Sequence, residues 1–183
     1  MKRSVGAAAL TAVPALAAAG GDSSGGGADT PAGLWPLDAV TVDPSRRRSG
    51  NQDLDAAFAT VRPQDGQQVQ EVPGGNRLGT DRGHRLEAKV TGHPSSADRP
   101  ITCTTTTAAE QSPTQLRIDR PGYTNGSPWV TDLAPRTRTR TRTRTVVGVV
   151  GGHREGGDTA DTSCSSCFGE QVRALHQQAS GSP

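Results

Sequence analysis

Apolar residues in this chain are sparse, and they occur in short groups separated by polar stretches rich in Gly, Pro, Ser and Thr. The first weak apolar cluster spans residues 34–62, where Leu54 and Phe58 follow Asp53 at i, i+4 spacing. This spacing predicts a short helix that Asp53 caps. Residues 63–100 are polar and repeatedly interrupted by Pro and Gly, which indicates a linker.

β-type patterns concentrate in residues 101–150, where β-branched residues predict a run of short strands. The last segment, 151–183, begins as a Gly-rich loop and contains a Cys-x-x-Cys pair. Apolar residues at positions 168, 172 and 175 then recur with helical spacing. They predict a short amphipathic helix near the C-terminus. The expected strands lie at 86–90, 101–107, 115–118, 130–133 and 136–150.

The N-terminus has the layout of a secretory signal peptide. Lys2 and Arg3 form a positive end, and a weakly apolar helical run of about fifteen residues follows it. Small residues precede a predicted cleavage between Ala19 and Gly20, so residues 1–19 are interpreted as the signal. Residues 20–33 are a Gly/Ser-rich tether. No later stretch is long and apolar enough to remain in a membrane after cleavage.

This N-terminal region resembles the secreted and lipoprotein precursors of high-GC bacteria, in which a Leu-Ala-Ala/Gly motif leads into a lipidated Cys and a tether. Here Leu16-Ala17-Ala18-Ala19-Gly20 is followed by Gly21, and the Cys of the lipobox is missing. The resemblance covers about 27 residues. It implies an extracytoplasmic location, either secreted or in the cell envelope.

Composition argues against a large globule. Gly and Pro account for 36 of the 183 residues, and only five residues are aromatic. From Gly20 onward, Leu, Ile, Val and Phe make up 24 of 164 residues, below the roughly 20% under which chains are usually disordered. The sequence therefore predicts a mostly disordered, irregular chain with a signal helix, a small β-rich patch and a short C-terminal helix.

One local charge pattern stands out, because the mature chain has balanced charge after the signal is removed. Arg-Thr repeats five times over residues 136–145. In a strand, all five guanidinium groups would lie on one face and could contact a polyanion weakly. The alternatives are a solvated arm produced by repeat slippage or an edge strand shielded by charge. The five arginines are Arg136, Arg138, Arg140, Arg142 and Arg144.

The three cysteines allow several interpretations. In an oxidising compartment we expect one disulfide, either Cys164–Cys167 or Cys103 with one of them. The Cys-x-x-Cys pair before a helix is similar to the motif of thioredoxin-like oxidoreductases. With His153 and His176, the two cysteines could also form a Cys₂His₂ metal set.

Two short strings are similar to serine-protease elements. Residues 21–26 resemble a Gly-Asp-Ser-Gly-Gly element, and residues 149–152 resemble the mature N-terminus of such proteases. The first lies in the tether and only 31 residues follow the second. Both are interpreted as chance matches.

The sequence thus favours an exported, non-enzymatic and largely flexible protein that is monomeric and has no cofactor. Its partner is unknown, beyond weak contact with a polyanion or the cell envelope. Two alternatives stay open. One is a spurious or frameshifted open reading frame without a selected function, suggested by the high-GC residue bias. The other is a small exported redox or metal-binding protein built on Cys164 and Cys167.

Overall fold

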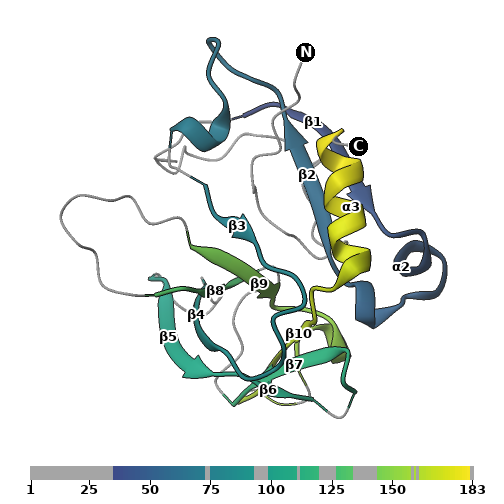
Figure 1. Ribbon diagram of the computed structural model, residues 1–183, viewed down its shortest axis with the longest axis vertical. Helices are drawn as coiled ribbons and strands as arrows, with labels where there is room; N and C mark the ends of the chain where they lie inside the picture. Colours follow the sequence, from purple (N-terminus) through teal and green to yellow (C-terminus); the bar gives the residue numbers. More distant parts are fainter. Residues whose placement is uncertain are drawn as a thin grey trace.

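The computed structural model describes residues 35–72, 75–92, 99–110, 112–119, 127–133, 144–157, 159 and 161–181. The described part consists mainly of short strands, with one longer helix at its C-terminal end (Figure 1). Its elements are β1 (Leu37–Val42), α2 (Pro44–Ser49), η1 (Gln52–Leu54), β2 (Ala57–Val61), η2 (Val69–Glu71), β3 (Arg77–Leu78), β4 (Glu87–Gly92), β5 (Ile101–Thr106), β6 (Ala108–Ala109), β7 (Gln115–Ile118), β8 (Pro128–Thr131), β9 (Thr145–Val149), η3 (His153–Glu155), β10 (Ser163–Ser166) and α3 (Glu170–Ser180).

The strands from β4 to β10 close into a barrel. One sheet has the order β3-β9-β8-β4-β5, and the other has the order β10-β7-β6. The two sheets are joined on one side by Thr107, the single residue between β5 and β6. Thr107 is buried, and its hydroxyl accepts a hydrogen bond from Leu86 N at 3.0 Å. A closed barrel leaves few unpaired strand edges.

The second seam, between β9 and β10, is held by a side chain. Val149 N donates to Ser165 Oγ at 2.9 Å, and Gly151 N donates to Cys164 O at 2.9 Å. Gly148 makes this close approach possible, because a Cβ there would lie 2.4 Å from Ser165 Oγ. The absence of a side chain at Gly148 therefore permits the barrel to close.

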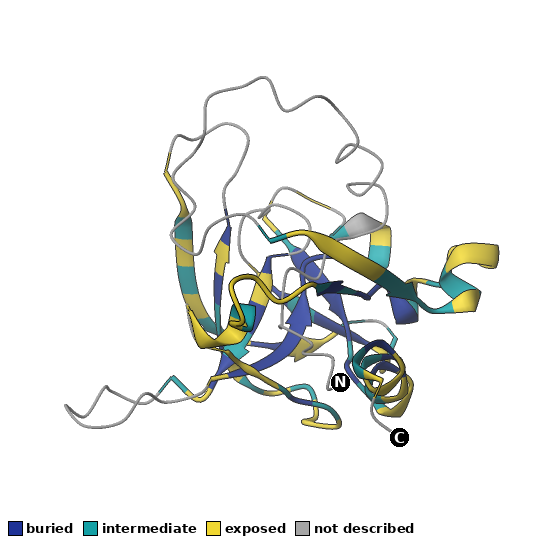
Figure 2. Cartoon of the chain, turned by 90° about the horizontal axis from the view of Figure 1, so that it is seen from above, coloured by how far each residue is buried: buried dark blue, intermediate teal, exposed yellow. Residues whose placement is uncertain are grey.

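Two apolar cores share strand β9, all of which is buried. Val147 and Val150 pack inside the barrel around Trp129, which is fully buried. Val146 and Val149 pack outside it, against α3 and the ribbon formed by β1 and β2. Figure 2 shows the continuous buried layer that results. Strand β9 thus separates the two cores and contributes side chains to both.

The β1–β2 ribbon and α3 form the outer layer. β2 pairs antiparallel with β1, and Phe58 from β2 packs in the same core as Val172 and Leu175 from α3. A two-stranded ribbon is marginal alone, so this packing against a helix stabilises it. α3 ends at Ser180 and is capped by Gly181, which takes the left-handed conformation. No helix in the described ranges is long and apolar enough to cross a membrane.

The prediction of a mostly disordered chain is wrong. The described residues form ten strands in three sheets and a C-terminal helix. The apolar count missed the core because short and polar side chains fill much of it. Buried positions of this kind are Thr60, Thr107, Gln115, Ser127, Thr131, Thr145, Ser163, Ser165 and Ser166.

The predicted helix after Asp53 is also wrong. Asn51 caps a single 3₁₀ turn at Gln52–Leu54, with its Oδ1 accepting from Asp53 N at 3.0 Å. Phe58 then lies in strand β2. The predicted C-terminal helix is present as α3. The signal peptide, its cleavage site and the tether lie outside the described residues, as does the Arg-Thr repeat up to residue 143.

Gly148→Ala should weaken the β9–β10 seam, because the new Cβ collides with Ser165 Oγ. We expect a loss of about 1–3 kcal/mol in the free energy of unfolding, measured by urea denaturation. Gly75→Ala is the matched control, because its Cβ would meet only Gln70 Cβ at 3.6 Å. Adding Ser165→Ala to Gly148→Ala should cost less than the sum of the single changes. Equal stability of Gly148→Ala and Gly75→Ala would contradict the seam's role.

Candidate functional site

A buried carboxylate, that of Asp55, lies where the ribbon meets the barrel. The residue is 3% exposed. It follows the 3₁₀ turn Gln52–Leu54, and Ala56 N donates to Leu54 O at 2.8 Å across it. Its φ of −78° and ψ of 62° are those of an inverse γ-turn. This tight turn sends Leu54 into the core and the Asp55 side chain toward the barrel.

Both carboxylate oxygens of Asp55 have partners from other segments. Oδ2 accepts a hydrogen bond from Gly152 N at 2.8 Å, at the end of the barrel strand β9. Oδ1 lies 2.7 Å from Nε of Arg46, whose side chain on α2 is 15% exposed. A charge buried this deeply requires such partners, because an isolated carboxylate loses its hydration. Asp55 therefore links α2, the ribbon and the barrel.

The two contacts differ in kind. The Arg46 Nε–H group does not point along the line to Oδ1, so the pair is ionic and is not an aligned hydrogen bond. Among the described residues, Oδ1 therefore has no hydrogen-bond donor. This buried oxygen could accept a hydrogen bond from another group only if the Arg46 guanidinium, 2.7 Å away, moved from its place.

Gly152 is required at its position by conformation and by space. Its φ is 76°, which is in the region that favours glycine. A Cβ there would lie 2.4 Å from Gln115 Oε1 and 2.9 Å from Ser166 N. The backbone at Gly152 can therefore pass between Gln115 and Ser166 only because this residue lacks a side chain, and a Cβ at the preceding Gly151 would lie 3.1 Å from Asp55 Oδ2.

Gln115 is the second polar link between the two layers. It is 2% exposed, and its Oε1 accepts from His153 N at 3.1 Å. Its Nε2 donates to Gln52 O at 3.0 Å and to Asp53 Oδ1 at 2.8 Å. All three bonds require this orientation of the amide. Gln115 thus holds the 3₁₀ turn against the Gly152–His153 segment.

The three cysteines are not brought together as a redox site. Cys164 lies in strand β10, with its Sγ 3.9 Å from Glu110 Oε2. Cys167 follows that strand, and α3 begins only at Glu170. Neither thiol is therefore at the helix N-terminus that the motif requires. Cys103 lies on β5, and none of the three forms a disulfide in this structure, so the disulfide stays a prediction.

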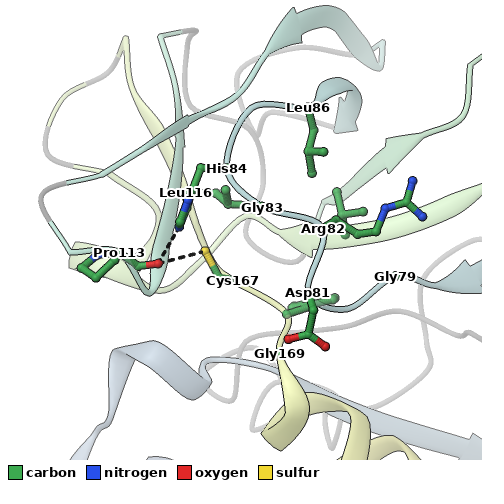
Figure 3. A pocket seen from close by; sticks show the side chains of 12 residues that line it. Gly79, Asp81, Arg82, Gly83, His84, Leu86, Pro113, Leu116, Cys167 and Gly169 are labelled. Carbon is green, nitrogen blue, oxygen red and sulfur yellow. Dashed lines mark hydrogen bonds between the residues drawn. The ribbon is translucent and has the colours of Figure 1, made fainter.

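Cys167 lines a pocket of about 180 Å³ between the β3–β4 connection and the start of α3 (Figure 3). Its Sγ lies 3.7 Å from Pro113 O, and His84 Nε2 lies 2.6 Å from the same oxygen. Burial, with a further contribution from the charge of Asp53, raises the pKa of Cys167 to about 11. The thiol is protonated at neutral pH, so it is a poor nucleophile and a poor metal ligand.

The predicted metal set is not assembled either. His176 packs edge-on against Phe58, with ring centroids 5.2 Å apart, and burial lowers its pKa. The backbone of His153 belongs instead to the Gln115 network. The described residues contain no group of three His, Cys, Asp or Glu side chains suited to a metal ion. Of the five repeat arginines only Arg144 is described, and its carbonyl accepts from Arg77 N at 2.7 Å.

The sequence reading missed Asp55, Arg46 and Gln115. One signal was available for Asp55, which is a second acidic residue directly before the apolar Ala56–Phe58 segment. The Gly-Gly pair after the valine run was also visible, but it was interpreted as part of a chance match. Arg46 and Gln115 carry no sequence signal that points to this network.

No family model and no curated protein matches the chain. Solved structures do match. The protease Anisep from Arthrobacter nicotinovorans aligns with a TM-score of 0.65 and 21% identity, covering 83% of this chain and 69% of Anisep. The thermostable serine protease AL20 from an extremophilic microorganism gives 0.68 and 16%, covering 84% and 71%. A Glu endopeptidase gives 0.61 and 13%, covering 82% and 66%. These similarities show that the chain has a chymotrypsin-like protease fold.

The comparison overturns the predicted function. A non-enzymatic, largely flexible protein of low complexity was expected, but the chain has a fold shared with three proteases. The expectation that it is not an enzyme is corrected on the same finding. The two alternatives fail as well. A frameshifted reading frame does not account for this fold, and a redox or metal protein does not account for its similarity to three proteases.

Gln115→Glu should make stability depend on pH. The introduced carboxyl would have to keep its one proton to donate toward either Asp53 Oδ1 or Gln52 O, so folding raises its pKa above the unfolded value of about 4.3. The variant should approach wild-type stability below about pH 4.3 and lose about 1–3 kcal/mol as the pH rises to 7. Urea unfolding at several pH values measures this. Gln171→Glu, on the exposed face of α3, is the control. Parallel pH profiles for the two variants would contradict the assigned network.

Proposed function

We propose that this chain is an exported serine-peptidase-type hydrolase in which Asp55, at the junction of the ribbon and the barrel, positions the general base. The observation that carries the proposal is the buried Asp55 carboxylate in a chymotrypsin-like fold. The names of the structural neighbours support a peptidase, since all three are proteases.

The chemistry of serine hydrolases needs a carboxylate of this kind. A histidine takes the proton of the attacking serine, and a buried carboxylate orients that histidine and stabilises its charged form. Asp55 is buried and its Oδ2 is held by Gly152 N, so the carboxylate has a defined direction. Its Oδ1 can accept the ring N–H of a histidine. We therefore assign Asp55 as the residue that positions the general base.

The contacts of one serine and three histidines in the described part of the chain show where each lies relative to the Asp55 carboxylate. Ser127, directly before β8, accepts a hydrogen bond from Val150 N through its carbonyl and is 7% exposed. His153 directly follows Gly152, the residue that binds Asp55. His84 and His176 have contacts elsewhere, with Pro113 and Phe58. Chemical labelling can identify the reacting serine without assuming which one it is.

Asp55→Asn should slow the reaction by roughly 100-fold or more, because a carboxamide cannot stabilise the protonated base. The measurement is the rate at which a fluorophosphonate probe attaches to the full chain, together with cleavage of fluorescent casein. In this reaction the serine oxygen bonds to phosphorus, fluoride leaves, and the serine proton passes to the base. Mass spectrometry of the digested product should find the label on one serine.

Asp38→Asn is the control, since Asp38 pairs with Arg62 on the ribbon, in a contact separate from the Asp55 network. Circular dichroism should show that each variant is folded. Equal labelling rates in wild type and Asp55→Asn would contradict the role of Asp55. Unselective labelling of many serines would contradict a dedicated nucleophile.

Export is proposed on the signal-like N-terminus and is tested separately. When the full-length gene is expressed in a bacterium, we expect the protein in the medium or the cell envelope, with Gly20 as its first residue. Intact-mass analysis of the recovered protein measures this. Recovery of the whole chain from the cytosol, with Met1 in place, would contradict export.

A further inference from the structure

We propose that Arg46 is an autoinhibitory contact that blocks Oδ1 of Asp55 until α2 moves away. This inference rests on the proposed function and concerns how the hydrolase site would be regulated. It starts from the fact that Arg46 lies beside Oδ1, the oxygen assigned to the general base.

Arg46 differs from its neighbours in direction and burial. The three residues Arg46, Arg47 and Arg48 are consecutive on α2, and only Arg46 reaches inward, with its side chain 15% exposed. The other two are exposed. Arg46 also donates from Nη1 to Gly50 O at 3.0 Å, which fastens the guanidinium to the end of its own helix. The helix therefore delivers one specific cation to the carboxylate.

Arg46 and a histidine cannot both use Oδ1. The guanidinium Nε is 2.7 Å from this oxygen, so it occupies the space in which an imidazole N–H would have to lie. The guanidinium also pairs with the negative charge of the carboxylate, which would otherwise stabilise the protonated form of the base. Because the N–H is poorly aligned, the contact lacks the hydrogen bond that an imidazole could form there. In this arrangement Oδ1 of Asp55 is therefore a hydrogen-bond acceptor that receives no hydrogen bond from the described residues.

The helix that carries Arg46 is suited to withdrawal. α2 has six residues and buries none of them, and it lies at the edge of the molecule (Figure 1). Its start depends on Asp43, whose Oδ1 accepts from Ser45 N at 2.7 Å; hydrogen bonds from Ser45 lower the pKa of Asp43. A further contact joins Asn51 Nδ2 to Ser45 Oγ at 3.2 Å. Moving α2 outward would break the Asn51–Ser45 and Arg46–Asp55 contacts without opening either apolar core, since no residue of α2 belongs to a core.

The test compares fluorophosphonate labelling rates in the full chain. Arg46→Gln should label about tenfold faster than wild type even if its melting temperature is lower, because Oδ1 becomes available. Arg47→Gln and Arg48→Gln are matched controls on the same helix and should label at the wild-type rate. A folded Arg46→Gln that labels no faster than these controls would overturn the proposal and indicate a purely structural ion pair.

A second variant covers the case in which Arg46→Gln fails to fold. Asp43→Ala keeps the Arg46 side chain but removes the cap of the helix that carries it. Because α2 should then leave its position more often, we expect the labelling rate to rise about twofold to fivefold. No increase in folded Asp43→Ala would then overturn the proposal. If the folded wild type and all these variants stay unlabelled and cleave no peptide, the hydrolase proposal itself fails. If the wild type reacts and neither change accelerates it, only the autoinhibitory role fails.

Discussion

Burial of the Asp55 charge is the constraint on which the arrangement of this fold depends. A carboxylate that leaves water must receive charge or hydrogen bonds from the protein, and here these come from two distant parts of the chain. Gly152 supplies a backbone N–H from the barrel and Arg46 supplies a cation from α2. The ribbon and the barrel can therefore pack closely only in the arrangement that satisfies Asp55. Gly152 can supply this N–H only because it lacks a side chain, since a Cβ there would collide with Gln115 and Ser166 of the barrel.

The fold could be predicted from the sequence in its local elements and not in its assembly. β-branched runs correctly indicated strands near β5 and β7, and helical spacing indicated α3. Strand β10, with the sequence Ser-Cys-Ser-Ser, looks polar and is nevertheless entirely buried. Its three serines are buried, and the hydroxyl of Ser165 accepts a backbone N–H across the β9–β10 seam. A count of large apolar residues cannot register such a core, because Ser, Thr and Ala fill space without contributing to the count.

Short sequence motifs could not predict the Asp55 site, because its residues are far apart in the sequence. Gly152 and Asp55 are separated by 97 positions, and Gln115 joins segments that lie 38 and 62 positions away. The cysteine pair and the arginine repeat drew attention because their members are adjacent in sequence. In the structure the two cysteines contact different groups, Glu110 and Pro113. Contacts between residues so far apart in the sequence can be recognised only once the fold of the barrel is known.

The seam between β9 and β10 has a consequence for how the molecule fluctuates. A ladder of backbone hydrogen bonds separates cooperatively, whereas this junction is held by the Ser165 hydroxyl and a single amide of Gly151. Amide hydrogen exchange at Val149 and Gly151 would therefore proceed by a small local opening, well before the barrel unfolds. The same stretch of backbone continues to Gly152, which anchors Asp55. The serine contact at the seam and the backbone anchor of the carboxylate therefore lie on one continuous stretch of four residues, 149–152.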